Sequence, residues 1–362
     1  MTSKQKILIA PLDWGLGHAT RCIPVIRELL RQNEEVIFAA DRQTAALLKN
    51  EFPELKLISL NGYRISYSKW LPMSVTMLLQ SPKILLSILR EHRELKKIIS
   101  EEKIDAVISD NRYGLWNKKI HSVFITHQVM IKCPAWLRFL EPVLYRINKF
   151  FILKYDECWV PDDDQKLSGD LAHRYQLPSN AKLIGTLSRW KGEKVISTEK
   201  KYDVLGIVSG PEPHRSSFEK LLIQQSGKSK QKFLIVSGKP NEQNETVINE
   251  NLSIVSHLNS KKLLEAITNA ATVICRSGYS GIMDLEAIGK RAILVPTPGQ
   301  TEQIYLAEYL QQKKKHISIS QKKFQSQNLP DRINKITSGN FRKENNSLPQ
   351  IIEAWRKKIT VC

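Results

Sequence analysis

The chain has 362 residues, of which 41% are hydrophobic and 25% charged, and this composition excludes a largely disordered or collagen-like protein. Lys and Arg number 55 against 36 Asp and Glu, so the formal net charge is +19 and the surface attracts phosphates, anionic lipid or nucleic acid. The length exceeds that of one ordinary core and predicts two domains.

The cysteines and the apolar stretches indicate a cytoplasmic protein. The five cysteines are scattered without CxxC spacing, so we expect reduced thiols and neither a disulfide framework nor a metal site. The opening MTSKQKILIAPL lacks the apolar core and cleavage site of a secretory signal. No stretch reaches roughly 18 uninterrupted apolar residues, so we expect any membrane contact to be peripheral, on the inner face.

Short apolar runs typical of strands alternate with helical patterns along both halves of the chain. The runs are KILIAPL, EVIFAA, LKLISL, DAVISD, VFITH and ECWVPD, and then DVLGIVSG, KFLIVSG, LSIVSHL, TVICRSG and AILVPT. Such alternation predicts an α/β protein with two Rossmann-like domains and parallel sheets. We place the domains at residues 1–186 and 203–345, with a linker at 187–202. The closing helix, 346–362, can cross back to the N-terminal domain.

The stretch from Tyr63 to Arg93 mixes Trp, Met and Leu with Lys and Arg. A basic amphipathic stretch with an aromatic residue is typical of a helix that lies in a membrane interface. Rossmann helices are also amphipathic, so packing on the chain's own sheet is an equal alternative.

The loop PLDWGLGHATR follows the first predicted strand. Gly15 and Gly17 permit a tight turn and close approach of a ligand to the backbone, and His18 can act as a general base or bind a phosphate or sugar hydroxyl. The spacing is GxGH, whereas a dinucleotide cofactor needs GxGxxG, so we expect no cofactor. A structural turn with a capping histidine is the alternative.

A second loop, VSGPEPHRSSFEK, holds the same topological position in the second domain. Ser209, Gly210, His214 and Arg215 combine a flexible strand end with groups suited to the oxygens of a pyrophosphate. The alternative is an ordinary turn with a helix-capping serine.

The third stretch is VICRSGYSGIMDLEAIGKRAILVPTPGQTEQ. It favours a binding site more than the other two loops do, because two consecutive strands end in it and their polar ends converge on one pocket. Acidic side chains at such a place can accept hydrogen bonds from ribose hydroxyls. The candidate donor-binding residues here are Arg276, Ser277, Gly278, Asp284, Glu302 and Gln303.

Polar residues also follow two predicted strands of the first domain. Asp110, Asn111, Arg112 and His127 can line an acceptor site there, or can simply cap their loops. The run PDDDQ contains an Asp-x-Asp, but it ends an N-domain strand away from the donor loops, so we expect a solvated turn and no metal.

The motif CRSG, followed by an acidic helix and then LVPTPGQTEQ, resembles the donor-binding segment of family 28 GT-B glycosyltransferases, known for the peptidoglycan GlcNAc transferase that acts on a lipid-linked intermediate. The resemblance covers both domains but is close only for residues 271–310. Glycine-poor first and second loops, and Asp at the ribose position, make the chain a divergent relative.

The resemblance implies two Rossmann-like domains whose sheets face a central cleft, and a nucleotide-sugar donor, with UDP-sugar the first candidate. It implies that Gly210 lies near the diphosphate, that Leu258 within 256–259 lies against uracil, and that Asp284 binds the ribose. Glu302 and Gln303 would contact the sugar, and His18 would face the acceptor.

The predicted reaction is metal-independent transfer of the sugar to an acceptor hydroxyl, with inversion implied by the resemblance. His18 is the first candidate for the base and Asp110 the second. Gly210, His214, Arg215 and Arg276 would stabilise the leaving diphosphate. The acceptor can be lipid-linked or a small molecule, and the basic charge suits an anionic membrane surface.

Two other functions remain open from the sequence. A UDP-sugar 2-epimerase shares the architecture and the donor pocket but needs no acceptor. A basic nucleic-acid-binding protein would fit the net charge, but the lysines are dispersed and no RNA- or DNA-binding motif is present.

Overall fold

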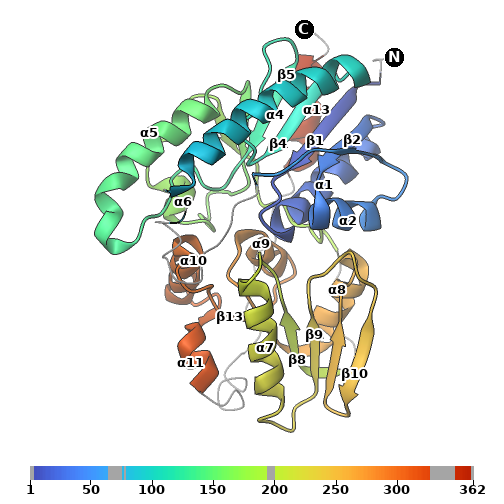
Figure 1. Cartoon of the computed structure of the whole chain (residues 1–362), viewed down its shortest axis with the longest axis vertical. Helices are drawn as coiled ribbons and strands as arrows, with labels where there is room; N and C mark the ends of the chain where they lie inside the picture. Colours follow the sequence, from blue (N-terminus) through green and yellow to red (C-terminus); the bar gives the residue numbers. More distant parts are fainter. Residues whose placement is uncertain (1–3, 64–75, 77–78, 194–199, 327–346, 360–362) are drawn as a thin grey trace. The chain divides into compact units, whose positions relative to one another are not determined.

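The computed structural model describes residues 4–63, 76, 79–193, 200–326 and 347–359. These residues form two compact units (Figure 1). Unit 1 comprises Met1–Trp14, His18–Leu187 and Glu344–Cys362, and unit 2 comprises Gly15–Gly17 and Ser188–Lys343. Residues 327–346, and residues 64–75 and 77–78 of the amphipathic stretch, lie outside the described residues.

Unit 1 is built on a seven-stranded sheet of order β3-β2-β1-β4-β5-β6-β7 in which every neighbouring pair is parallel. Its strands are β1 (Lys6–Pro11), β2 (Glu35–Ala40), β3 (Lys56–Ser59), β4 (Ala106–Asp110), β5 (His121–Ile125), β6 (Glu157–Val160) and β7 (Ala181–Leu183). The central strands are buried almost throughout, as expected for a parallel sheet that is covered on both faces.

Helices cover this sheet. They are α1 (Leu16–Arg31), α2 (Arg42–Glu51), α4 (Ser81–Glu102), η1 (Ala135–Leu140), α5 (Glu141–Ile152), α6 (Asp170–His173) and α13 (Leu348–Ile359). Helix α4 packs Leu95 and Ile98 on Leu8 and Val107 of the central strands. The same helix exposes Leu85, Leu86 and Leu89, so it packs on its own sheet by one face only.

Unit 2 repeats the design with a sheet of order β10-β11-β9-β8-β12-β13-β14. Its strands are β8 (Tyr202–Ile207), β9 (Phe233–Val236), β10 (Glu245–Asn249), β11 (Leu252–Val255), β12 (Ala270–Cys275), β13 (Ala292–Leu294) and β14 (Ile317–Ser318). Its helices are α7 (His214–Ser226), α8 (Ser260–Thr268), α9 (Tyr279–Ala287), α10 (Thr301–Gln312) and α11 (Gln321–Ser326).

One strand of unit 2 departs from the predicted parallel sheet. Strand β10 pairs antiparallel with β11, and only Glu250 and Asn251 separate the two strands. A connection this short permits a hairpin and excludes a parallel crossover. The polar run NEQNETVINEN supplies an exposed edge strand that the sequence analysis did not predict.

The C-terminal helix α13 belongs to unit 1 (Figure 1). Its Trp355 is fully buried, lies edge-on to Trp159 at 5.5 Å between ring centroids, and donates its Nε1–H to His121 Nδ1 at 3.0 Å. Lys358 of α13 lies 2.5 Å from the Glu157 carboxylate, which also binds Lys182 at 2.6 Å. The last helix is therefore part of the packing of β5 and β6.

Trp355→Ala should destabilise unit 1 by about 3–5 kcal/mol, because it removes a buried indole and leaves a cavity beside Trp159. Lys357→Ala is the matched control, since Lys357 lies on the exposed side of the same helix and its ion pair among the described residues is with Glu353 one turn away. Its effect should stay within about 0.5 kcal/mol. Guanidinium unfolding measures both. Equal unfolding free energies for the two variants would contradict this packing.

Glu157 makes the stability of unit 1 depend on acid. Burial alone would raise the pKa of its carboxyl, but hydrogen bonds from Lys182, Lys358 and Trp159 outweigh burial and lower the pKa to about 2. Because this value lies below the ordinary 4.5, the pairs contribute stability above that pH and lose it as the pH falls toward 2. The unfolding free energy of Glu157→Gln should therefore fall less steeply between these two pH values than that of the parent. Identical slopes would contradict the assignment.

Candidate functional site

The strand order of unit 1 reverses between β1 and β4, and the loops that leave these two strands carry its polar site. Strand β1 pairs with β4 up to Pro11 and Asp110, and Leu12 N–H donates to the Asp110 carbonyl at 2.9 Å. In open α/β sheets, ligands bind beside the carboxyl ends of strands at such a switch point. Gly15 has a φ of +116°, which a residue with a side chain rarely adopts, so glycine permits the turn into α1.

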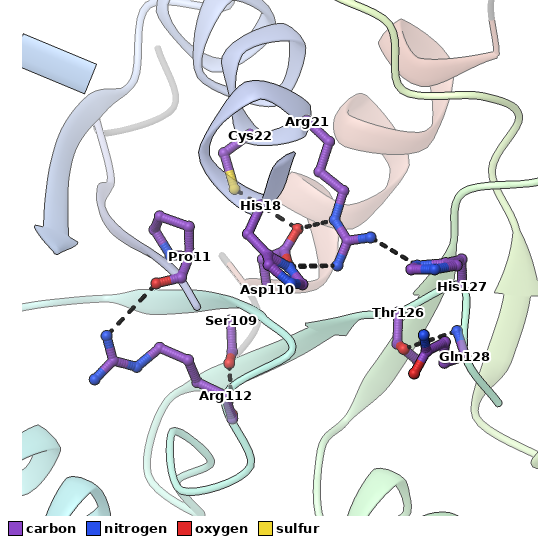
Figure 2. A network of polar contacts seen from close by, with 10 residues as sticks. All are labelled: Pro11, His18, Arg21, Cys22, Ser109, Asp110, Arg112, Thr126, His127 and Gln128. Atoms are coloured by element: carbon purple, nitrogen blue, oxygen red, sulfur yellow. Dashed lines mark hydrogen bonds and ion pairs between the residues drawn. The ribbon is translucent and has the colours of Figure 1, made fainter. Parts of the chain in front are cut away.

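His18 and Asp110 lie in direct contact at this strand end (Figure 2). His18 Nδ1 is 2.6 Å from Asp110 Oδ1, and the carboxylate is fully buried. His18 stands in the first turn of α1, so its ring lies over the end of β4. The structure thus brings together the two residues that the sequence analysis named as candidate bases.

Arg21 is the third member of this network, and the sequence analysis missed it. The guanidinium is buried and holds Asp110 through two nitrogens, Nε to Oδ2 and Nη2 to Oδ1, the latter at 2.5 Å. Its Nη1 lies 2.8 Å from His127 Nδ1 (Figure 2). Positions 18 and 21 are three apart on one helix and share a face, a spacing that could have revealed Arg21.

The geometry favours one tautomer of His18. A carboxylate only accepts, so the 2.6 Å contact with Asp110 is a hydrogen bond only when Nδ1 carries a proton. Arg21 Nη2 also lies 2.9 Å from Nδ1, but this nitrogen donates to Asp110 at the shorter distance. With Nδ1–H directed at the carboxylate, Nε2 holds the lone pair and can accept a proton.

Asp110 is suited to hold this histidine. Burial alone would raise the pKa of its carboxyl, but the charges of Arg21 and His18, with their hydrogen bonds, outweigh burial and hold the pKa below its usual value. The Cys22 thiol lies 3.9 Å away, and its own pKa is raised well above the usual value by burial and by Asp110, so it stays a neutral neighbour. Asp110 therefore carries its charge at neutral pH.

The other predicted residues of unit 1 differ in what they contact. Arg112 is fully buried, pairs with Glu91 at 2.8 Å and donates to the carbonyls of Leu60 and Asn61, so it anchors loops. Asn111, at a φ of +59°, keeps a buried Oδ1 with no hydrogen-bond partner among the described residues. At this strand end, Asn111 Oδ1 is therefore a buried acceptor without a partner among the described residues, next to Asp110.

Unit 2 has its own switch point between β8 and β12, and Arg276 follows β12 there. Its guanidinium is buried, donates to the carbonyls of Val295 and Pro296 at 3.1 and 3.2 Å, and stacks on the Phe218 ring at 4.1 Å. Burial lowers its pKa to about 10. No carboxylate of the described residues pairs with it, so this buried positive charge lacks a counter-ion.

Other predicted donor residues surround this arginine. Arg276 Nη2 lies 3.4 Å from the His214 carbonyl, and burial, followed by the charge of Arg276, lowers the pKa of the His214 ring. Ser277 donates to the Gln303 carbonyl at 2.8 Å, and the Gln303 side chain accepts from Thr297 N–H at 2.9 Å. The structure therefore joins the ends of β12 and β13 and the start of α10.

Three of the predicted donor residues lie in loops or at a helix end. Gly210 has a φ of +106°, so only glycine fits its turn without strain. Leu258 precedes α8 in the loop after β11. Glu302 lies in the first turn of α10.

Arg215 and Asp284 already have ionic partners. Arg215 pairs with Glu212 and lies 3.6 Å from Glu219, so two carboxylates balance its charge. Asp284 accepts from Ser188 Oγ at 2.9 Å and from Arg189 Nε at 3.0 Å. Burial raises the pKa of the Asp284 carboxyl in spite of Arg189. Its partners here are thus side chains from 188–189, whereas the sequence analysis named ribose hydroxyls.

The Asp-x-Asp run does not form the solvated turn that the sequence analysis expected. Asp162 is fully buried and accepts from the N–H groups of Leu167 and Ser168, the Ser168 hydroxyl and His173 Nε2. The buried Asp162 carboxylate therefore stabilises the turn that follows β6 through these hydrogen bonds. Across the parts of the chain that the structure describes, no three His, Cys, Asp or Glu side chains gather as metal ligands.

Comparisons with known proteins agree with this architecture. Residues 213–357 match the model of the glycosyltransferase family 28 C-terminal domain. A protein of Methanosarcina mazei described as an uncharacterized glycosyltransferase is 24% identical over 322 residues, 82% of this chain and 81% of that protein.

Solved structures share the fold at low identity. The glycotransferase of kitacinnamycin superposes with a TM-score of 0.61 at 14% identity, covering 100% of this chain and 96% of that one. UGT89C1 of Arabidopsis thaliana, complexed with UDP-L-rhamnose, gives 0.58 at 12% identity, covering 98% and 94%. With two Rossmann-like sheets, a match to the family 28 C-terminal domain and these relatives, the chain is a glycosyltransferase of the GT-B fold whose C-terminal part resembles family 28.

Proposed function

We propose that the chain transfers a sugar from a UDP-sugar to an acceptor hydroxyl, with His18 as the general base. The contact between His18 and the buried Asp110 carboxylate is the observation that carries this proposal. It supplies an imidazole whose Nδ1 is held by a carboxylate, at a strand end where ligands bind in this fold.

In the proposed reaction, His18 Nε2 takes the proton of the acceptor hydroxyl while its oxygen bonds to the anomeric carbon of the donor. The bond from that carbon to the diphosphate breaks, and the nucleoside diphosphate leaves with the electron pair. Asp110 stabilises the imidazolium that forms, and Arg21 is a positioning residue that keeps Asp110 in place. Attack opposite the leaving group inverts the anomeric centre.

The donor is proposed to bind at the switch point of unit 2. Arg276 lacks a carboxylate partner among the described residues, and a buried cation without a counter-ion favours an anionic ligand. The diphosphate of the donor supplies that charge, with Gly210 and His214 beside it. Arg215 is less suited, because Glu212 and Glu219 already balance it. Without a metal, these groups meet the charge of the leaving group.

The match to the family 28 C-terminal domain, and UGT89C1 with its bound UDP-L-rhamnose, support the proposal for the rest of the donor site. Leu258 would lie against uracil, and Glu302 and Gln303 would contact the sugar. Asp284 would bind ribose only by exchanging its pair with Arg189 for the ribose hydroxyls.

The acceptor is proposed to bind on unit 1 beside His18. The unpartnered Oδ1 of Asn111 can accept a hydrogen bond from the acceptor. His127 contacts Arg21, which joins it to the same network. A lipid-linked acceptor suits the basic charge of the chain, with the enzyme at the inner face of the cytoplasmic membrane.

His18→Ala should lower the rate of sugar transfer by about 10²–10⁴-fold, because the base is lost. The assay mixes each of several UDP-sugars with polyisoprenyl-linked sugars, which carry free hydroxyls, or with small hydroxylated acceptors, and follows UDP release. UDP should raise the melting temperature of this variant as much as that of the parent, since His18 does not bind the donor. Transfer at the parent rate would overturn the base assignment.

Two further measurements separate the roles in this network. Asp110→Asn should also lose transfer, whereas Arg21→Lys should retain more of it than Arg21→Gln, because a cation still holds Asp110. A UDP-sugar incubated with the parent and no acceptor should remain unchanged. Isomerisation of the sugar would support an epimerase instead.

Arg276→Gln should abolish the rise in melting temperature that UDP gives, because the buried charge that faces the diphosphate is removed. Arg291→Gln is the control, since Arg291 donates to the Lys315 carbonyl at the other end of β13. Without UDP, the Arg276→Gln variant should still unfold cooperatively, at a lower melting temperature than the parent, because its hydrogen bonds to the Val295 and Pro296 carbonyls are lost. A parental response to UDP would contradict the diphosphate role.

A further inference from the structure

Lysines that are scattered along the sequence gather at one end of the unit 2 sheet. Strands β8, β9 and β12 are parallel neighbours (Figure 1), so their amino ends meet at the edge opposite the switch point. Lys200 and Lys201 lie directly before β8, and Lys232 lies directly before β9. Lys290 lies two residues before β13, the strand next to β12. The fold therefore brings four positive charges to this amino edge.

A surface hollow of about 490 Å³ lies at the amino edge. Its lining residues are Lys200, Lys201, Tyr202, Asp203 and Lys232. Sites for small molecules have volumes of roughly 300–1,000 Å³, so the hollow is large enough for a compact ligand. Such sites are mostly apolar, whereas this lining carries three ammonium groups and one carboxylate. The hollow therefore suits a negatively charged ligand.

Carboxylates of the protein do not balance these ammonium groups. In the part of the chain that the structure describes, no ion pair joins Lys200, Lys201 or Lys232 to a carboxylate. Lys200 Nζ donates to the Thr268 carbonyl at 2.7 Å, which leaves its charge in place. The Asp203 carboxylate accepts the backbone N–H of Lys232 at 2.7 Å. The hollow thus keeps an excess of positive charge.

Half-buried Lys290 adds to this excess. Its Nζ donates to the Ala270 carbonyl at 2.6 Å, two residues after the carbonyl that Lys200 contacts. Burial, followed by the charge of Lys200, lowers the pKa of Lys290 to about 8. The two ammonium groups therefore repel each other, and an anion bound next to them would offset this repulsion.

The backbone of this edge has no donors to spare for a ligand. The N–H groups of Lys201 and Tyr202 both donate to the Asn269 carbonyl, at 2.9 and 3.2 Å. The N–H of Asp203 donates to the Lys232 carbonyl at 2.9 Å. Recognition therefore falls to the side-chain ammonium groups, which attract phosphate oxygens as compact point charges.

The surroundings of the hollow favour a soluble ligand over a membrane or a nucleic acid. In the described part of unit 2, the exposed large apolar side chains are Ile223, Val247 and Ile248, and none of them lines the hollow. Interfacial lipid binding needs exposed apolar groups to insert, and single-stranded nucleic acid needs aromatic rings to stack on. Tyr202, the aromatic residue of the lining, is only partly exposed.

From this geometry and charge we propose that the hollow binds a soluble small molecule with two or more phosphate groups. Lys200, Lys201 and Lys232 contact the phosphate oxygens, and Lys290 adds its charge to the same place. The proposed donor site lies at the carboxyl ends of the same strands, where Arg276 follows β12. The two sites therefore occupy opposite ends of the unit 2 sheet, and the second site does not depend on the proposed sugar transfer.

Isothermal titration calorimetry with sodium tripolyphosphate tests the proposal, at low salt and with saturating UDP to fill the proposed donor site. The parent should show one saturable site, and added salt should weaken it. The lysine triple variant, Lys200→Gln with Lys201→Gln and Lys232→Gln, should bind about tenfold more weakly or worse. Each exposed charge pair contributes roughly two- to fivefold, and three are removed.

A charge-matched control comes from unit 1. Lys96, Lys118 and Lys119 are exposed lysines, so changing all three to Gln removes the same net charge. This control triple variant should bind tripolyphosphate like the parent and should keep its cooperative thermal unfolding, as should the lysine triple variant. Arg276→Gln, titrated without UDP, should also bind tripolyphosphate like the parent, so the second site and the donor site are told apart.

Vesicles that contain phosphatidic acid separate a soluble phosphate from a lipid headgroup. The lysine triple variant and the control triple variant should sediment equally with these vesicles, because only net charge differs from the parent. Weaker sedimentation of the lysine triple variant alone would assign the hollow to a headgroup and overturn the proposal of a soluble ligand.

Three calorimetric results would also overturn the proposal. The first is the absence of saturable tripolyphosphate binding to the parent at low salt. The second is equal weakening in the lysine triple variant and the control triple variant, since net charge alone would then explain the binding. The third is loss of tripolyphosphate binding in Arg276→Gln, because the ligand would then occupy the proposed donor site.

Discussion

The buried pair of Arg21 and Asp110 is the interaction on which the unit 1 site depends. Removing either charge from water is costly, and the pair is tolerated because two guanidinium nitrogens meet both carboxylate oxygens. Since Arg21 lies on α1 and Asp110 ends β4, the pair also fixes the first turn of α1, and hence His18, against the sheet. The position of the histidine is therefore a consequence of charge pairing as well as of the loop glycines.

The two buried arginines at the two switch points differ in a way that matches their proposed roles. Arg21 is neutralised by its own chain and can act only by holding other groups in place. Arg276 is surrounded by carbonyl oxygens, which lower the cost of burying a cation but do not cancel its charge. A protein that leaves such a charge uncompensated gives up stability there, and an anionic ligand restores it.

Alternating strands and helices allowed the two Rossmann-like sheets to be predicted from the sequence, and strand ends identified His18 and Asp110. The antiparallel β10 was not predicted, because a polar edge strand lacks an apolar pattern. Arg21 was missed because a basic residue on an amphipathic helix usually faces solvent. The pairing of Asp284 with Arg189 joins positions 95 residues apart, which no local pattern reveals.

The Asp284–Arg189 pair affects which residues can bind the ribose of the donor. To bind ribose, the Asp284 carboxylate must first release Ser188 and Arg189. Breaking a buried ion pair destabilises the protein strongly, because the remaining charge stays buried without a partner. Ribose hydroxyls are neutral and cannot replace a guanidinium charge. If Arg189 keeps its partner in the donor complex, Asp284 acts by fixing residues 188–189 against α9, and recognition of the nucleotide falls to backbone groups and to Arg276. The family's ribose carboxylate would then have become a structural group in this divergent chain, with its shorter side chain the physical reason.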